Sequence, residues 1–233
     1  MNLRKSFLWP AVVALAAVAI AWVLGVRRFW PCAFFALCAF SAATILEEYQ
    51  RGIRTRMRRG ESVGRAFLEL MRRNQRRYAG YVVHLAVLLM FVGFAGAGFN
   101  LEETKLLAPG QVWSLNGYDL EYRQSRPVTH PHYAGAVARL ALSKDGRPVG
   151  ILTPQKRMYF QQEQPATIPA VSSTLREDFY VILVGLEEDR SVAVKVYINP
   201  LVNWIWIGGF VFVIGNTLLL WPLPERRARR SES

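Results

Sequence analysis

The chain has 233 residues, of which 52% are hydrophobic, and it carries a formal net charge of +12. This length could hold one large or two small soluble domains. The apolar residues lie in four long blocks, however, which a soluble protein of this size could hardly bury. The surplus of positive charge lies beside these blocks, whereas residues 100–200 hold eleven basic and eleven acidic residues. The charge therefore predicts contact with a membrane surface and argues against nucleic acid as a partner.

None of the four apolar blocks contains Asp, Glu, Lys or Arg, and they predict four transmembrane helices. A helix rises about 1.5 Å per residue, so roughly 20 apolar residues cross a hydrocarbon core of about 30 Å. The first block follows a basic start, as in a secretory signal, but it is long and lacks a small-x-small cleavage pattern, so we expect a retained helix. The blocks are Phe7–Val26, Phe29–Leu46, Ala79–Phe99 and Leu201–Trp221.

Arginines set the expected orientation. Residues 47–78 hold ten Arg and four Glu, and both ends of the chain are basic. Positive charge is enriched on the cytoplasmic side of membrane proteins, so we expect both termini and 47–78 in the cytoplasm and 100–200 outside it. Arg27 and Arg28, in the expected outer turn, are the one dissenting feature.

The second half of the 47–78 loop shows helical periodicity. Its apolar residues are Val63, Ala66, Phe67, Leu70 and Met71, and arginines occupy the other faces. This pattern predicts a short amphipathic helix on the membrane surface, with its arginines facing anionic lipid. A solvated basic linker and a contact with an acidic partner remain alternatives.

Alternation of apolar and polar residues predicts β-strands between 100 and 200. The clearest are Tyr118–Tyr122, Ala136–Leu142, Val149–Leu152, Phe179–Gly185 and Val192–Ile198. The turn Lys144–Arg147 contains Asp-Gly, which tolerates the positive φ angles of a type I′ hairpin. We therefore expect a small antiparallel β sandwich or barrel.

The expected membrane protein thus has four transmembrane α-helices and one β domain, in six segments. They are a transmembrane hairpin (1–46), a basic cytoplasmic loop with an amphipathic helix (47–78), a third transmembrane helix (79–99), an extracytoplasmic β domain (100–200), a fourth transmembrane helix (201–222) and a basic cytoplasmic tail (223–233).

One ionisable residue, His84, lies within an apolar block. It falls about four residues inside the cytoplasmic boundary, on the order of 7 Å deep. Such residues are costly in a membrane and are by default candidates for function. A neutral imidazole can bind a metal or haem iron, although a hydrogen bond to a neighbouring helix is the alternative. The chain has no second intramembrane His, so a bis-His haem would need a ligand from another polypeptide.

The remaining candidate residues carry weaker signals. His130 and His132 could bind a metal, but the intervening proline favours an exposed loop. Cys32 and Cys38 form no C-x-x-C motif, and we expect them to pack inertly. Gly93, Gly96 and Ala97 would let a neighbouring helix approach closely. No phosphate-binding loop or nucleophile motif is present, so the chain has no self-contained active site in sequence.

Four stretches resemble one known family in the same order: Arg76–Leu85, Pro154–Phe160, Asp178–Val181 and Tyr197–Gly209. They are similar to the C-terminal part of the CcmF family, the haem lyase subunit of bacterial cytochrome c maturation. The last stretch, YINPLVNWIWIGG, is the most specific. The Trp-rich W-G-x-x-W-x-W-D segment of full-length members is absent, so the resemblance covers the C-terminal part only.

This resemblance implies a protein of the bacterial inner membrane that helps to attach haem to the C-x-x-C-H motif of apocytochrome c. It implies that His84 is an axial ligand of a membrane b-type haem, whose other ligand comes from a partner chain. The implied partners are an N-terminal haem lyase protein or a missing N-terminal region, a haem chaperone and apocytochrome c, in addition to membrane lipid. The alternatives are a non-catalytic scaffold whose β domain docks a partner and, more weakly, an accessory subunit of a transporter.

Overall fold

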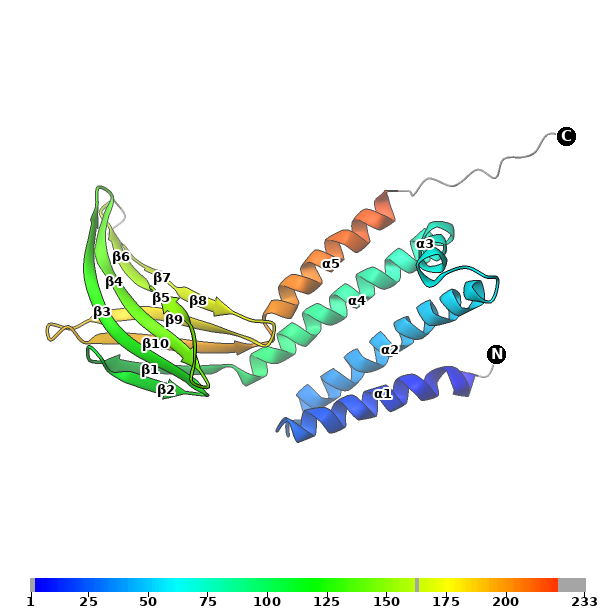
Figure 1. Ribbon diagram of the computed structural model, residues 1–233, viewed down its shortest axis with the longest axis horizontal. Coiled ribbons are helices and arrows are strands. Elements are labelled where there is room, and N and C mark those ends of the chain that lie inside the picture. The colour runs from blue at the N-terminus through cyan, green and yellow to red at the C-terminus, as the bar shows by residue number, and fades with distance from the viewer. Residues whose placement is uncertain (1–2, 162–163, 222–233) are drawn as a thin grey trace. The chain divides into compact units, whose positions relative to one another are not determined.

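The computed structural model describes residues 3–161 and 164–221 and divides into two compact units (Figure 1). One unit consists of Met1–Gly98 with Trp204–Ser233 and is helical; the other, Phe99–Asn203, is built of β-strands. The predicted tail 223–233 lies outside the described residues. Each unit has its own packing and is described by itself below.

Three helices of the first unit are long and apolar enough to cross a membrane. They are α2, α4 and α5, where the span of α4 includes the short 3₁₀ turn η1 at its end. The apolar part of α1, Phe7–Val23, is shorter, so a fourth crossing remains a prediction. The bounds are α1 Leu3–Val23, α2 Phe29–Met57, α3 Val63–Arg73, α4 Gln75–Gly96, η1 Ala97–Phe99 and α5 Asn203–Leu220.

Helix α2 continues beyond the apolar block, which ends at Leu46, as far as Met57. Charged side chains support this extension, because Arg51 pairs with Glu47 at 2.9 Å and with Glu48 at 3.1 Å. Such pairs, spaced three and four residues apart, each stabilise an exposed helix by about 0.2–0.5 kcal/mol.

Helix α3 packs part of its apolar face on protein. Ala66, Leu70 and Met71 are buried, and Leu70 and Met71 share a cluster with Tyr78 of α4, against which Ile53 of α2 packs. The apolar residues Val63, Phe67 and Leu68 of the same helix are exposed. Packing against α2 and α4 therefore fixes the rotation of α3, and the contact of its exposed side with lipid stays a prediction.

Helices α4 and α5 lie side by side (Figure 1). They touch through two glycines of α5. A Cβ atom at Gly208 would lie 2.7 Å from the carbonyl oxygen of Ala86 and 2.8 Å from the backbone nitrogen of Met90. At Gly215 it would lie 2.8 Å from a methyl group of Val83. Glycines seven residues apart share one helix face, so the α4 backbone lies directly against this side of α5.

The β unit is an antiparallel two-sheet sandwich. The first sheet has the order β1-β10-β9-β8; the second has the order β2-β3-β4-β6-β7, with β5 also paired to β4. The strands are β1 Leu101–Leu107, β2 Val112–Leu115, β3 Tyr118–His130, β4 Tyr133–Lys144, β5 Arg147–Leu152, β6 Gln155–Tyr159, β7 Gln164–Ile168, β8 Ala170–Ser173, β9 Glu177–Leu186 and β10 Val192–Pro200. Of the two predicted architectures, the sandwich is therefore the one formed.

The predicted alternation is confirmed for β3 and β10. Tyr118, Leu120 and Tyr122 are buried in the core that the two sheets share, as are Val192–Ile198 at alternate positions. The turn at Asp145-Gly146 has φ angles of 49° and 74°, as a type I′ turn requires. A second turn of this kind, formed by Asn116 and Gly117, joins β2 to β3 and was not among the predicted turns. Its φ angles are 50° at Asn116 and 77° at Gly117.

Three polar side chains join the two sheets at one edge of this core. The Tyr118 hydroxyl of β3 donates to Glu177 of β9 at 3.0 Å, and the Lys144 ammonium of β4 bonds to both. Burial raises the pKa of Tyr118. Burial lowers the pKa of Lys144, but its bonds to Glu177 and Tyr118 outweigh this and raise the pKa overall.

We expect Glu177→Gln to lower the free energy of unfolding of the β unit by about 1 kcal/mol, because it removes the charged acceptor of both donors. Both raised pKa values mean that the folded state holds these protons more tightly than the unfolded chain. Their contribution to stability is therefore full below about pH 10 and is lost as the pH rises further. Hydrogen exchange of β-unit peptides during urea titration, at pH 8 and pH 11, measures this. Glu121→Gln, whose partner Arg123 is exposed, is the control and should change nothing. Equal effects of the two substitutions would contradict the stabilising role of the Tyr118–Lys144–Glu177 cluster.

Candidate functional site

His84 lies on α4, and its side chain is exposed. The buried residues Ala86 and Gly93 of the same helix lie on the opposite side, about 200° and 180° around the helix axis from His84. The side of α4 that meets α5 at Ala86 is thus the one without the imidazole. Within this unit the ring is available to a ligand or to another chain.

One hydrogen bond fixes the chemistry of this imidazole. Its Nδ1 lies 2.8 Å from the carbonyl oxygen of Gly80, one turn earlier. A carbonyl oxygen can only accept, so Nδ1 carries the proton and, in the neutral ring, Nε2 carries the lone pair. Histidines that ligate metals are typically held in this way, with the other nitrogen bonded to a carbonyl or carboxylate.

The surface beside His84 is open, and toward Phe91 it is apolar. A Cβ atom added at Gly80 would meet no atom within 4 Å, so this turn of the helix presents bare backbone. Two turns further along the same face, Phe91 is 42% exposed and packs edge-to-face on Phe34 of α2 at 5.5 Å. The arrangement offers one nitrogen ligand on an apolar surface, which suits a flat apolar group bound through a metal.

The entry to α4 is anchored by contacts that the sequence did not reveal. Arg77 pairs with Glu48 of α2 at 2.6 Å and donates to the Tyr81 hydroxyl at 3.1 Å. The Tyr49 hydroxyl of α2 donates to the carbonyl of Tyr78 at 2.6 Å. These bonds hold the first turns of α4 against α2, and they fix the position of the helix just before His84.

His84 alone does not complete a metal site. Among the residues that the structure describes, no three His, Cys, Asp or Glu side chains gather closely enough to hold a metal ion. His130 and His132 are in the β unit, at the exposed turn between β3 and β4. The His130 ring stacks on Tyr133 at 4.9 Å, and its Nδ1 lies 3.4 Å from the backbone nitrogen of His132.

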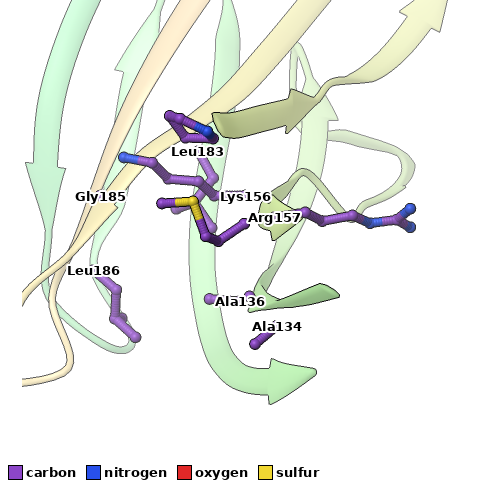
Figure 2. Close-up of a pocket in the computed structure, with 10 residues that line it drawn as sticks. Ala134, Ala136, Lys156, Arg157, Leu183, Gly185 and Leu186 are labelled. Atoms are coloured by element: carbon purple, nitrogen blue, oxygen red, sulfur yellow. The ribbon is translucent and has the colours of Figure 1, made fainter. Parts of the chain in front are cut away.

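The β unit also contains a largely apolar pocket of about 250 Å³ (Figure 2). It is lined by Ala134, Gly135, Ala136, Lys156, Arg157, Met158, Pro165, Leu183, Gly185 and Leu186. Lys156 donates to the carbonyl of Val184, and Arg157 extends away from Leu183 and Gly185 (Figure 2). The lining offers no pair of nucleophile and base, so this pocket does not supply an active site.

Comparisons with known proteins match parts of this chain to one family. Residues 98–200 match the family model described as the CcmF C-terminal beta-sandwich. The cytochrome c-type biogenesis protein CcmF of Escherichia coli K12 is 31% identical over 66% of this chain and 24% of its own length. The CcmF of Haemophilus influenzae Rd is 29% identical over 70% of this chain and 25% of its own length.

Two further matches cover nearly the whole chain. The cytochrome c-type biogenesis protein ccl1 of Rhodobacter capsulatus is 26% identical over 98% of this chain and 33% of its own length. A solved structure, "Cytochrome c Heme Lyase CcmF", superposes with a TM-score of 0.71 over 91% of this chain and 34% of that chain, at 21% identity, and shows the shared fold. The chain thus spans a quarter to a third of the length of these relatives.

Proposed function

Because this chain corresponds in sequence and fold to the C-terminal part of CcmF, we propose that it is the C-terminal component of a cytochrome c haem lyase complex. The relatives are cytochrome c biogenesis proteins about three times as long. The rest of the machinery would come from an N-terminal partner or a preceding region. A haem chaperone would deliver haem, and apocytochrome c would receive it.

The proposed role of His84 is axial ligation of a b-type haem in the membrane. The observation that carries it is the Nδ1 bond to Gly80, which leaves the Nε2 lone pair on an exposed apolar face. A haem bound there would supply electron transfer. Its role would be to keep a second haem, the one being attached to apocytochrome c, in the reduced state. This chain would provide one ligand, and a His of the partner would provide the other.

The proposed topology follows from charge and apolar length. The apolar helices and the bacterial relatives indicate a bacterial membrane protein. We infer that α1 also crosses the inner membrane, so that four crossings leave both termini and the loop 47–78 in the cytoplasm. The neutral β unit would then be periplasmic.

The experiment compares His84→Gly with wild type after each is purified with its N-terminal partner. We expect the low-spin b-type absorption spectrum to disappear, the yield of cytochrome c to fall at least tenfold, and added imidazole to restore the spectrum by replacing the missing ligand. The control is Leu88→Ala, one turn away, which should leave the spectrum unchanged. An unaltered spectrum in His84→Gly would refute the ligand role and favour the scaffold alternative.

A further inference from the structure

The cytoplasmic end of the helical unit, as oriented above, contains a charged pocket of about 830 Å³ between the end of α2 and helix α3. Its lining consists of Arg56, Glu61, Arg65, Glu69, Arg72, Arg73 and Asn74. Four guanidinium groups thus meet two carboxylates in one hollow. The enrichment of positive charge on one side of a membrane explains why arginines are numerous here, but it does not explain why they converge on a pocket.

The ion pairs within this arginine pocket leave a net positive charge. Arg56 is bound to both oxygens of Glu61 at 3.1 Å, and its side chain is only 11% exposed, so this pair forms a fixed wall. Glu69 lies 4.0 Å from Arg72 and 3.9 Å from Arg73, which are long contacts shared by one carboxylate. Arg65 is exposed and has no ion-pair partner among the residues that the structure describes. The lining holds four positive and two negative side chains, so its net charge is positive.

The packing of α3 makes this surface rigid. Arg65, Glu69 and Arg72 are spaced four and three residues apart, so they share one face of the helix. The other side of α3 is held by Leu70 and Met71 in the cluster with Tyr78. The guanidinium groups are therefore presented by a helix that cannot rotate freely.

The ligand chemistry that fits is a phosphate group, because the guanidinium fork matches the oxygens of a phosphate in paired hydrogen bonds. Leu68 lies next to the arginine row on α3 and is 62% exposed, which places an apolar side chain beside the charges. Helices α2 and α4, against which α3 packs, are both candidate membrane spans. A charged pocket beside an apolar residue at the end of membrane helices favours a lipid over a soluble phosphate.

We propose that the arginine pocket binds the phosphate of an anionic phospholipid headgroup, with Arg65, Arg72 and Arg73 as its contacts. The Arg56–Glu61 pair forms the wall against which the headgroup lies. The site goes beyond the haem role and does not depend on it; it needs only that the helices lie in a bilayer.

The test uses the full chain in neutral detergent and counts bound lipid by native mass spectrometry. The probes are phosphatidylglycerol, phosphatidylcholine and inorganic phosphate. The triple variant Arg65→Gln, Arg72→Gln, Arg73→Gln should lose at least tenfold in affinity for phosphatidylglycerol. The charge-matched control is Arg54→Gln, Arg58→Gln, Arg59→Gln, outside the pocket lining, and it should stay within about twofold of wild type.

Other outcomes would overturn the proposal. Equal losses in the two triple variants would mean diffuse attraction by charge. Binding of phosphatidylcholine as tight as that of phosphatidylglycerol would mean no headgroup selection, and saturation by inorganic phosphate without lipid binding would mean a soluble ligand. If the triple variant does not fold, Arg65→Gln alone carries the test, because this side chain has no ion-pair partner in the described residues, and about a threefold loss is expected.

Discussion

Gly135→Ala is expected to lower the free energy of unfolding of the β unit by about 3 kcal/mol. Gly135 lies on β4 opposite Arg157 of β6. A Cβ atom at this position would lie 2.1 Å from the carbonyl oxygen of Lys156 and 3.0 Å from the Cα of Arg157. These obstacles are backbone atoms, so no rotation of a side chain can relieve the overlap. The two strands must separate, and the ladder between β4 and β6 is lost there.

Urea titration of the full chain in detergent, followed by hydrogen exchange of the β-unit peptides, measures this effect. The matched control is Gly150→Ala on β5, where an added Cβ atom meets nothing within 4 Å. That variant should be neutral or slightly stabilising, because alanine reduces the freedom of the unfolded chain. Similar urea midpoints for the two variants would show that β4 and β6 are not in backbone contact at this point.

Gly208→Ala is expected to cost about 2 kcal/mol in the helical unit, because the added methyl group separates α5 from α4. Two of the three atoms that it would meet, the Ala86 oxygen and the Met90 nitrogen, belong to the backbone of α4. Helix packing in a membrane depends on such close approach, since lipid is as apolar as the side chains.

The neighbouring residue supplies the control, since a Cβ atom at Gly209 would meet nothing within 4 Å. Thermal unfolding in mild detergent should show a lower midpoint for Gly208→Ala and an unchanged midpoint for Gly209→Ala. Faster hydrogen exchange in α4 and α5 should accompany the first change. If both variants unfold at the wild-type temperature, the glycine contact does not hold the two helices together.

Strands with a clear period of two were predictable, and the others were not. Val192–Ile198 alternates strictly because one face of β10 is buried in the core. β1 was missed because Glu102, Glu103 and Thr104 are consecutive exposed residues on an edge strand, held by pairing with β10 and not by alternation. Pairing partners depend on the tertiary fold, so no local pattern marks such a strand.

The candidate sites differ in the same way. His84 was predictable because an ionisable residue stands out in an apolar block, and its bond to Gly80 follows from the spacing of one helical turn. The arginine pocket was not, because it depends on the rotation that packing imposes on α3. Gly208 and Gly215 are seven residues apart, so a close helix contact could have been suspected from the sequence. The sequence does not show that α4 is the partner helix.

The pairing of the first and last strands of the β unit has a consequence for its history. Leu101 of β1 lies opposite Ile198 of β10, so the chain enters and leaves this unit at adjacent positions. Neighbouring strands are about 5 Å apart, a gap that a few residues can span. The β unit therefore resembles an insertion between two consecutive helices, α4 and α5. A single insertion could introduce such a unit, and a single exchange could replace it, without changing the packing of the membrane helices.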